Sequence, residues 1–206
     1  MKKIIVFLFA LLPSLLFAQK DANALLDKAV ARMKADAALQ MNYDYTVYDD
    51  DDVIVYSDNG TMLLDNGCYS LLMENMKVWC DGKTQWSYMK DIDEVYITDA
   101  DSEEAQNLSP LYIMEKYREN YKVSLEDKGT TALVVMTAMD AEAEVDRLEL
   151  LMDKKNARLQ SLFIYMPAQG RIEVFLNNYV ARCSFAAGEY VCPVDEFHTA
   201  EIIDMR

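Results

Sequence analysis

Val78-Trp79-Cys80-Asp81-Gly82-Lys83-Thr84-Gln85-Trp86-Ser87-Tyr88 is the stretch from which the fold can be worked out. Two runs of aromatic and β-forming residues flank a turn-forming triplet, which predicts a β-hairpin with a two-residue turn. Whether the turn centres on Asp81-Gly82 or on Gly82-Lys83, a period of two places Trp79, Trp86 and Tyr88 on one face. A three-residue turn would separate them. Both tryptophans of the chain are therefore expected side by side on one sheet surface, where ordinary core packing is the alternative to a binding role.

Residues 1–18 have the pattern of a secretory signal peptide. Lys2 and Lys3 precede an apolar run that ends at Phe17 and is too short to span a bilayer, and Ala18 supplies a small residue at the boundary. A membrane anchor is the alternative. We expect a cleaved signal peptide and a single mature domain of residues 19–206, a length that suits one hydrophobic core.

The chain is strongly acidic, with 35 Asp and Glu, 20 Lys and Arg, and a net charge of −15. Such a surface repels nucleic acids and anionic lipid headgroups, so we expect no nucleic-acid partner and no passive adhesion to membranes. The run Asp49-Asp50-Asp51-Asp52 lacks the alternating ligands and the glycine of a calcium loop, and a solvated turn is expected there. We expect neither a metal nor a cofactor.

The hydrophobic period changes after residue 38. From Asp21 to Ala38, apolar residues recur at steps of three and four, which predicts an amphipathic helix with Asp21 as its N-cap. Beyond it, short segments alternate apolar and polar residues, which predicts antiparallel strands with one buried face. The first such segment has its apolar residues at Met41, Tyr43, Tyr45 and Val47.

The strand pattern is interrupted between residues 101 and 120. Ser102 begins one helical segment, and Ser109-Pro110 places a cap and a proline at the first turn of a second that extends to Tyr117. Further strands are expected near residues 121–125, 131–139, 144–152, 158–166 and 171–179. This order predicts an α+β fold in which helices gather against one face of a large antiparallel sheet.

The four cysteines form two pairs by spacing. Cys68 and Cys80 are equidistant from Glu74, and Cys183 and Cys192 are equidistant from the pair at 187–188. Each pair would face across its own hairpin, so an oxidising compartment would favour disulfides 68–80 and 183–192, each contributing about 3 kcal/mol. A zinc site is the alternative, but these spacings are not those of zinc knuckles.

A disulfide between Cys68 and Cys80 would require both side chains to lie on one face of the hairpin. Tyr69, Leu71 and Trp79 would then share the opposite face, back to back with the disulfide.

Catalytic motifs are absent from the sequence. His198, the only histidine, has no accompanying nucleophile elbow, and the six glycines form no phosphate-binding loop. Carboxylate pairs are too frequent on this surface to select a glycosidase. We predict that the protein is not an enzyme.

Methionine and tyrosine are abundant, with 13 of each in 206 residues. Core packing explains many of them. Methionine also repacks readily, as a site for a flexible hydrocarbon requires, and tyrosine offers a polar tip for the rim of such a site.

The hairpin segment Asp81-Gly82-Lys83-Thr84-x-Trp86-x-Tyr88 resembles that of the LolA family of periplasmic outer-membrane lipoprotein carriers, especially its LolA-like chaperone variant. The similarity continues through Glu94-Val95, Ser109-Pro110, Asn178-Tyr179, Phe185 and the closing run 200–206. It covers nearly the whole mature chain. No single motif is diagnostic, and the order and spacing of several carry the resemblance.

The resemblance implies an unclosed, strongly curved antiparallel β half-barrel with an α-helical lid over its concave face. The helix at 21–38 and the helices at 102–117 would form the lid over a cavity for acyl chains. An acyl chain of about 15 methylenes exposes apolar area worth roughly 12 kcal/mol, so it must be shielded from water. Lid residues would fill the empty cavity and keep the net affinity moderate. Those expected to do so are Leu25, Val30, Leu111 and Met114.

On the sheet side, nine residues are expected to line this cavity, by parity with the hairpin face. They are Tyr45, Val47, Met62, Leu64, Tyr69, Leu71, Trp79, Trp86 and Tyr88. Tyr69 and Leu71 match positions where similar carriers place large inward-facing residues. One departure concerns the lid: many members have an Arg-Pro ahead of this strand whose arginine latches the lid, and here the region reads Leu64-Asp65-Asn66-Gly67.

The resemblance also implies a periplasmic location, a monomer and three partners: triacylated outer-membrane lipoproteins, an inner-membrane lipoprotein-releasing ABC complex and an acceptor at the outer membrane. No cysteine precedes Cys68, so the protein itself is expected to be unlipidated, which favours a mobile carrier. A periplasmic lipid-binding or lipoprotein-sensing module of the same fold is the alternative, and a structural β-protein without a ligand is a third.

Overall fold

The computed structural model describes residues 12–35, 38–102, 105, 114–115, 118–181 and 184–206. Within these ranges the elements are α1 (Leu12–Ala35), β1 (Leu39–Tyr48), β2 (Ile54–Asp65), β3 (Cys68–Met73), β4 (Met76–Cys80), β5 (Thr84–Met89), β6 (Glu94–Asp99), β7 (Tyr121–Lys128), β8 (Thr131–Ala138), β9 (Arg147–Asp153), β10 (Arg158–Met166), β11 (Gly170–Ala181), the 3₁₀ turns η1 (Ala187–Tyr190) and η2 (Val194–Glu196), and β12 (Glu201–Asp204).

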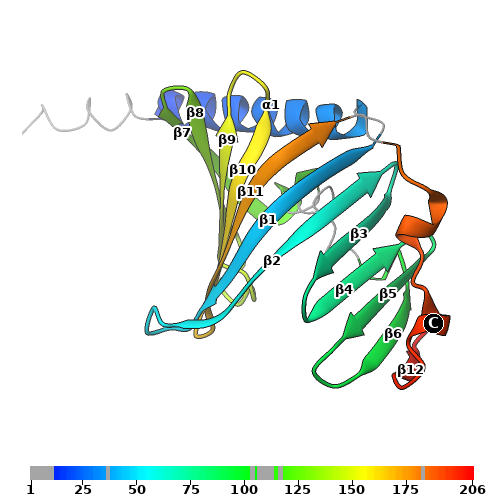
Figure 1. Cartoon of the computed structure of the whole chain (residues 1–206). Helices are drawn as coiled ribbons and strands as arrows, with labels where there is room; N and C mark the ends of the chain where they lie inside the picture. The colour runs from blue at the N-terminus through cyan, green and yellow to red at the C-terminus, as the bar shows by residue number, and fades with distance from the viewer. Residues whose placement is uncertain (1–11, 36–37, 103–104, 106–113, 116–117, 182–183) are drawn as a thin grey trace, which may run out of the picture.

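All the strands belong to one 12-stranded sheet of order β12-β6-β5-β4-β3-β2-β1-β11-β10-β9-β8-β7. Every pairing is antiparallel except that of β12 with β6, which is parallel. The sheet bends around α1 without closing, and β7 and β12 are its two free edges (Figure 1). The predicted fold class, an unclosed and curved antiparallel sheet with helical cover, is confirmed.

Helix α1 covers the inner face of the sheet at the β7 side. Ala22, Leu26, Ala29 and Val30 are buried in one cluster with apolar residues of β7, β8 and β9, which forms the main core. The helix begins at Leu12 and ends at Ala35, so Asp21 lies inside it and is not its N-cap. The predicted start was wrong because helical geometry continues through the apolar residues ahead of Asp21, where no residue breaks the helix before Leu12.

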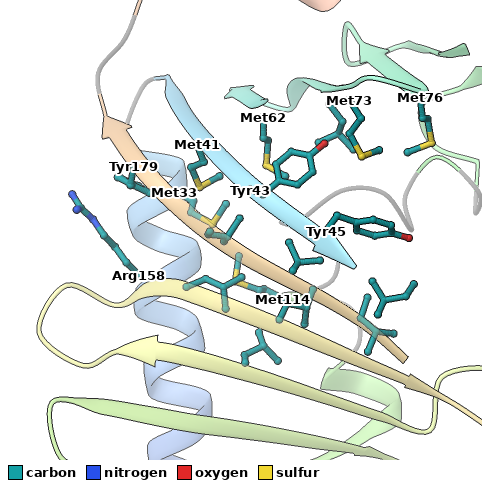
Figure 2. A pocket seen from close by; sticks show the side chains of 18 of the residues that line it. Met33, Met41, Tyr43, Tyr45, Met62, Met73, Met76, Met114, Arg158 and Tyr179 are labelled. Carbon is teal, nitrogen blue, oxygen red and sulfur yellow. The ribbon is translucent and has the colours of Figure 1, made fainter. Parts of the chain in front are cut away.

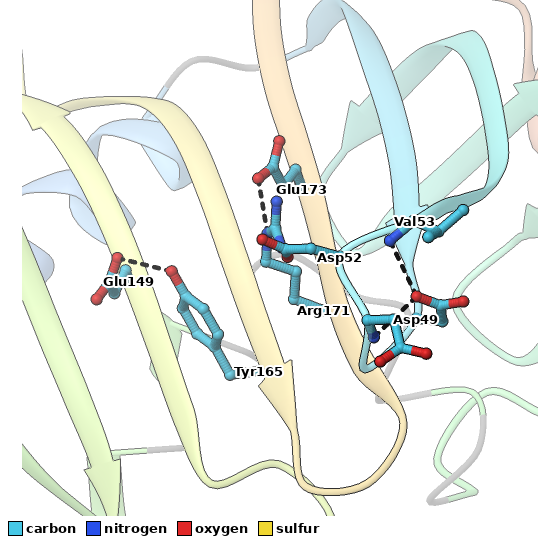
Figure 3. A network of polar contacts seen from close by, with 8 residues as sticks. Asp49, Asp52, Val53, Glu149, Tyr165, Arg171 and Glu173 are labelled. Carbon is cyan, nitrogen blue, oxygen red and sulfur yellow. Dashed lines mark hydrogen bonds and ion pairs between the residues drawn. The ribbon is translucent and has the colours of Figure 1, made fainter.

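The long β1–β2 hairpin turns at the acidic run, as expected for a turn. The backbone N–H groups of Asp51 and Val53 donate to one carboxylate oxygen of Asp49, at 3.0 and 2.9 Å. Figure 3 shows this turn beside the outer face of β11, where Arg171 contacts Asp52 and donates through Nε to Glu173 at 2.9 Å. Charged pairs therefore occupy the outer surface here, away from α1.

The C-terminal segment covers the outer face of the sheet at its other end. Trp79, Val95, Ile97 and Cys192 form a buried cluster there, and the ring of Phe197 packs against it. The segment ends in β12, a parallel edge strand that the hydrophobic pattern did not predict. This end of the sheet therefore has packing on both of its faces.

The helical segments expected at 102–117 fall mostly outside the described residues, and Leu111 lies outside them. Ala105 and Met114 are described, and both are buried. Across the described residues, no helix combines the length and the apolar character needed to cross a membrane.

Candidate functional site

A cavity of about 510 Å³ lies between α1 and the inner face of the sheet (Figure 2). Its lining is apolar apart from a few tyrosine, arginine, asparagine and aspartate side chains. The lining residues are Ala29, Arg32, Met33, Met41, Tyr43, Tyr45, Tyr56, Met62, Leu71, Met73, Asn75, Met76, Met89, Asp91, Met114, Leu150, Ala157, Arg158, Leu159, Leu162, Ile164, Ile172, Val174, Leu176 and Tyr179.

Methionine dominates one wall because strand register brings its side chains together. Met41 lies directly opposite Met62, and Met76 lies directly opposite Met89, so each pair points to the same face of the sheet. Met33 reaches the cavity from α1. Unbranched thioether side chains change rotamer at little cost, so this wall can adapt to hydrocarbon chains of different shape.

Tyr43 owes its position to the glycine on the neighbouring strand. Gly60 is its directly opposed partner, and a Cβ on Gly60 would lie 2.7 Å from the Tyr43 hydroxyl oxygen and 2.5 Å from the Leu72 carbonyl oxygen. The hydroxyl is buried and, in the part of the chain that the structure describes, has no hydrogen-bond partner. Burial, together with the nearby carboxylate of Asp58, raises the pKa of Tyr43 well above its ordinary value.

One end of the cavity has acidic and hydroxyl groups. The Tyr45 and Tyr56 rings meet edge to face at 6.1 Å, and the Tyr56 hydroxyl donates to Asp58 at 2.8 Å. Asp91 lines this end, in the turn that follows Met89. Burial opposes ionisation of Asp58, but hydrogen bonds from Tyr56 and the Asn59 backbone outweigh it and lower the pKa of this carboxyl.

Arg158 lies at the other end of the cavity. Arg158, the first residue of β10, places its guanidinium 4.1 Å from the centre of the Tyr179 ring, and Arg32 of α1 lines the same cavity. Figure 2 shows Arg158 and Tyr179 at the opposite end of the lining from Tyr45 and Met76. The cavity is therefore an apolar channel with ends of opposite charge.

Polar contacts connect α1 and the sheet to the segment around Met114. Lys34 pairs with Glu115 at 2.6 Å, and Asp27 pairs with Arg118 at 2.5 Å. On the sheet side, the Tyr69 hydroxyl is shared between the carbonyl oxygen of Ala105, at 3.0 Å, and the side-chain oxygen of Gln85.

Of the nine residues expected on the sheet side, Tyr45, Met62 and Leu71 line the cavity. Leu64 and Tyr69 share their face and are buried in an adjoining cluster with Leu71. Their side chains support the cavity wall without forming its surface.

Val47 shares the inner face but is not among the lining residues. Its directly opposed neighbours Tyr56 and Ile172 are lining residues. Among the expected lid residues, Met114 lines the cavity, whereas Val30 and Leu25 pack in the main core.

The expectation that Trp79, Trp86 and Tyr88 line the cavity was wrong. Trp79 and Trp86 are directly opposed, as predicted, across a turn centred on Gly82-Lys83. They point to the outer face, where Phe197 lies 6.0 Å from Trp79 and 4.4 Å from Tyr88 between ring centres. Their neighbours therefore come from the C-terminal segment and not from a ligand cavity.

Strand register explains the error. In β3 and β4, Tyr69 is opposite Cys80 and Leu71 is opposite Val78, so the turn centres between Glu74 and Asn75 and not on Glu74. This half-residue difference moves Trp79 to the face opposite Tyr69.

The same difference separates Cys68 from Cys80. With Cys80 opposite Tyr69, Cys68 is out of phase with it, and both are free thiols in the structure. The predicted 68–80 disulfide was wrong for this reason. Cys192 is also a free thiol, and Cys183, its predicted partner, lies outside the described residues. Burial, with a smaller contribution from Glu196, raises the pKa of Cys192 to about 11.

Sequence reasoning missed the second wall, formed by β9, β10 and β11. Leu162 is directly opposite both Leu150 and Val174, and all three line the cavity. The alternation along β11 at Ile172, Val174 and Leu176 would have found this wall, because it is the same signal that identified the first strand.

A metal is not indicated by the described residues, among which no three His, Cys, Asp or Glu side chains gather closely enough to hold an ion. The apolar lining of the cavity is suited to shielding a hydrocarbon chain from water.

Comparison with known proteins identifies the family of the chain. The family model described as "Outer membrane lipoprotein carrier protein LolA" matches residues 16–166, more than half of the chain. A search of curated proteins found no significant match.

Solved structures share the fold at low sequence identity. An uncharacterized conserved protein from Thermus thermophilus has a TM-score of 0.59 and 9% identity, covering 89% of this chain and 99% of its own. MucB has a TM-score of 0.50 and 11% identity, covering 89% of this chain and 66% of its own. A LolA superfamily protein from Nitrosomonas europaea has a TM-score of 0.44 and 10% identity, covering 84% and 98%.

Proposed function

We propose, on the premise that this chain belongs to the LolA family of outer membrane lipoprotein carrier proteins, that it shields the acyl chains of lipids or lipoproteins and carries them through the periplasm. The methionine-rich apolar cavity under α1 is the observation that carries this proposal. Each buried methylene is worth about 0.8 kcal/mol, so an acyl chain gains strongly from entering such a space. The proposal assigns no catalytic step.

The size of the cavity indicates that the structure is a closed form. A volume of 510 Å³ falls in the range of about 300–1,000 Å³ that holds one drug-sized ligand. Three acyl chains of a triacylated lipoprotein need more room, so loading requires α1 to move away from the sheet. Met114 packs with α1 in the main core, so α1 would move against an apolar contact.

Delivery of such a cargo implies a route. We propose that residues 1–18 act as a signal peptide that sends the chain to the periplasm. There it would receive triacylated lipoproteins from an inner-membrane lipoprotein-releasing ABC complex and pass them, as a monomer, to an acceptor at the outer membrane. The family description supports only the carriage of lipoproteins to the outer membrane, and the ABC complex and the acceptor are part of the proposal.

Native mass spectrometry of the protein purified from the periplasm of its own cells tests the proposal. A bound triacylated protein is the expected result. A free lipid instead would favour the alternative of a lipid-binding or lipoprotein-sensing module with the same fold. Protein that carries neither, and that does not take up added acyl chains, would overturn the proposal.

A matched pair of substitutions refines the test. Leu71 lines the cavity, and Leu72, the next residue, points to the outer face. Leu71→Glu should lose the bound acyl cargo, while Leu72→Glu should keep it, provided that both variants show the wild-type circular dichroism spectrum.

A further inference from the structure

We propose that the Arg158 end of the cavity is a binding site for an anionic headgroup, so that the preferred ligand is an amphiphile with a carboxylate or phosphate at the end of its hydrocarbon chain. This inference rests on the proposed function, since it assumes that a hydrocarbon chain fills the cavity. It adds the polarity and the chemical class of the ligand.

The first observation is that Arg158 keeps hydrogen-bond donors available at the cavity. Its Nε is buried and, among the residues that the structure describes, donates to no acceptor. Its guanidinium is stacked over the Tyr179 ring at 4.1 Å, which fixes its plane without using its N–H groups. A guanidinium held in this way presents a fork that matches the two oxygens of a carboxylate or phosphate.

The second observation is that Arg158 differs from four other described arginines, each of which forms an ion pair. Arg118, Arg147, Arg171 and Arg206 each contact a carboxylate. In a chain with 35 acidic residues, an arginine without such a partner is unexpected. Within the described ranges Arg158 has none.

The acid directly opposed to Arg158 in the sheet has a backbone partner of its own. Asp153 is the directly opposed residue on β9, and its carboxylate accepts a hydrogen bond from the Asn156 backbone N–H at 2.7 Å. It therefore caps the β9–β10 turn. Among the described residues, no carboxylate forms an ion pair with Arg158, so its charge can be matched by an anionic ligand.

The third observation is the direction of the field along the cavity. Arg158 places a cation at one end of the lining, and Asp91, two residues after Met89, adds an anion to the lining near Met76 at the other end (Figure 2). An anionic head is attracted to the first end and repelled by the second. The hydrocarbon chain therefore extends from Arg158 along the methionine wall toward Tyr45.

Three ligands with the same twelve-carbon chain test the inference: dodecanoate, dodecyl phosphate and dodecanol. Their dissociation constants are measured at pH 7.5 by displacement of the neutral dye Nile red from the full-length protein. Both anions should bind about tenfold more tightly than the alcohol, equivalent to about 1.4 kcal/mol. Inorganic phosphate alone should not displace the dye at concentrations up to that of the buffer salts, because it lacks the hydrocarbon chain.

The variant that tests the residue is Arg158→Gln, with Arg147→Gln as the matched control. Arg147 is also stacked on a tyrosine, 4.0 Å from the Tyr165 ring, but it is not among the cavity residues. Arg158→Gln should bring the anion preference to less than threefold, and Arg147→Gln should leave it unchanged. Arg158→Lys, which keeps the charge, should retain part of it.

The outcomes separate the inference from the proposed function. Equal affinity for the alcohol and the anions in the wild-type protein would overturn the headgroup site and leave the acyl-chain cavity in place. Anion preference that survives Arg158→Gln would also overturn it. Failure of the dye and of all three ligands to bind would overturn both.

Discussion

A glutamate substitution should weaken ligand binding when it lies on the inner face of the sheet and not when it lies outside the cavity. Val174 of β11 is directly opposite Tyr45 on one side and Leu162 on the other, and all three line the cavity. It is half-buried, so a carboxylate introduced there keeps part of its contact with water. Val180 is on the same strand, is 50% exposed and does not line the cavity, so Val180→Glu is the matched control.

The magnitude follows from what the bound chain would cover. Loss of the apolar contact removes part of the 1.5–3 kcal/mol that full burial of a valine is worth, or about 1 kcal/mol. The bound ligand would also remove water from the new carboxylate. Because desolvating the charged form is costly, the carboxylate would take up a proton when the ligand binds. Protonating a group of pKa about 4.3 at pH 7.5 costs about 4 kcal/mol, which is the upper limit of that contribution. Val174→Glu should therefore weaken acyl-chain binding at pH 7.5 by about 1–5 kcal/mol, which is about fivefold to several thousandfold.

The pH dependence gives the sharper assay. Because protonation becomes cheaper by about 1.4 kcal/mol for each unit of pH, the defect of Val174→Glu should shrink as the pH falls toward 5.5. Titration of the neutral dye Nile red, with the melting temperature as a control for folding, measures both quantities. Wild-type affinity in Val174→Glu, an equal loss in Val180→Glu, or a defect independent of pH would each refute the reasoning.

Three further predictions concern groups beside the cavity. Because burial holds the pKa of Tyr43 above the value of 10.0 expected in the unfolded chain, stability should fall as the pH rises above 10, and Tyr43→Phe should fall less steeply in urea titrations. Tyr69→Phe should cost about 1–3 kcal/mol in the same titrations, because the buried Ala105 carbonyl loses its donor; an unchanged midpoint would contradict that contact. Iodoacetamide should modify Cys68 before the buried Cys80 in the native protein, and recovery of a 68–80 disulfide-linked peptide would show that the register is wrong.

Local periodicity predicted which residues of one strand share a face. Met41, Tyr43 and Tyr45 alternate correctly, and Trp79 and Trp86 are opposed as the hairpin required. These relations hold within one strand or across one tight turn, where the side-chain period and the turn chemistry leave few alternatives. Asp81 adds to this by accepting hydrogen bonds from the Lys83 and Thr84 backbone N–H groups.

Relations between hairpins could not be predicted in the same way. The turn between β3 and β4 has no glycine in the sequence Glu74-Asn75 to fix its centre, and a shift of half a residue reversed the face of Trp79 relative to Tyr69. The cover on the aromatic pair comes from Phe197, more than a hundred residues away in the sequence. The sequence pattern of an aromatic cluster is the same whether a ligand or a distant segment of the chain covers it.

The contacts that close the cavity also bear on how cargo would be released. Lys34–Glu115 and Asp27–Arg118 are partly exposed ion pairs, and surface pairs are worth about 0–1 kcal/mol each. Met114, by contrast, is 1% exposed, and removing a side chain of its size from the core costs about 1.5–3 kcal/mol. Opening is therefore opposed mainly by apolar burial, which is the interaction that an incoming acyl chain restores. Since the ligand replaces contacts that the empty protein already makes, its net affinity stays below what its own buried area would give, and that difference allows a carrier to let go.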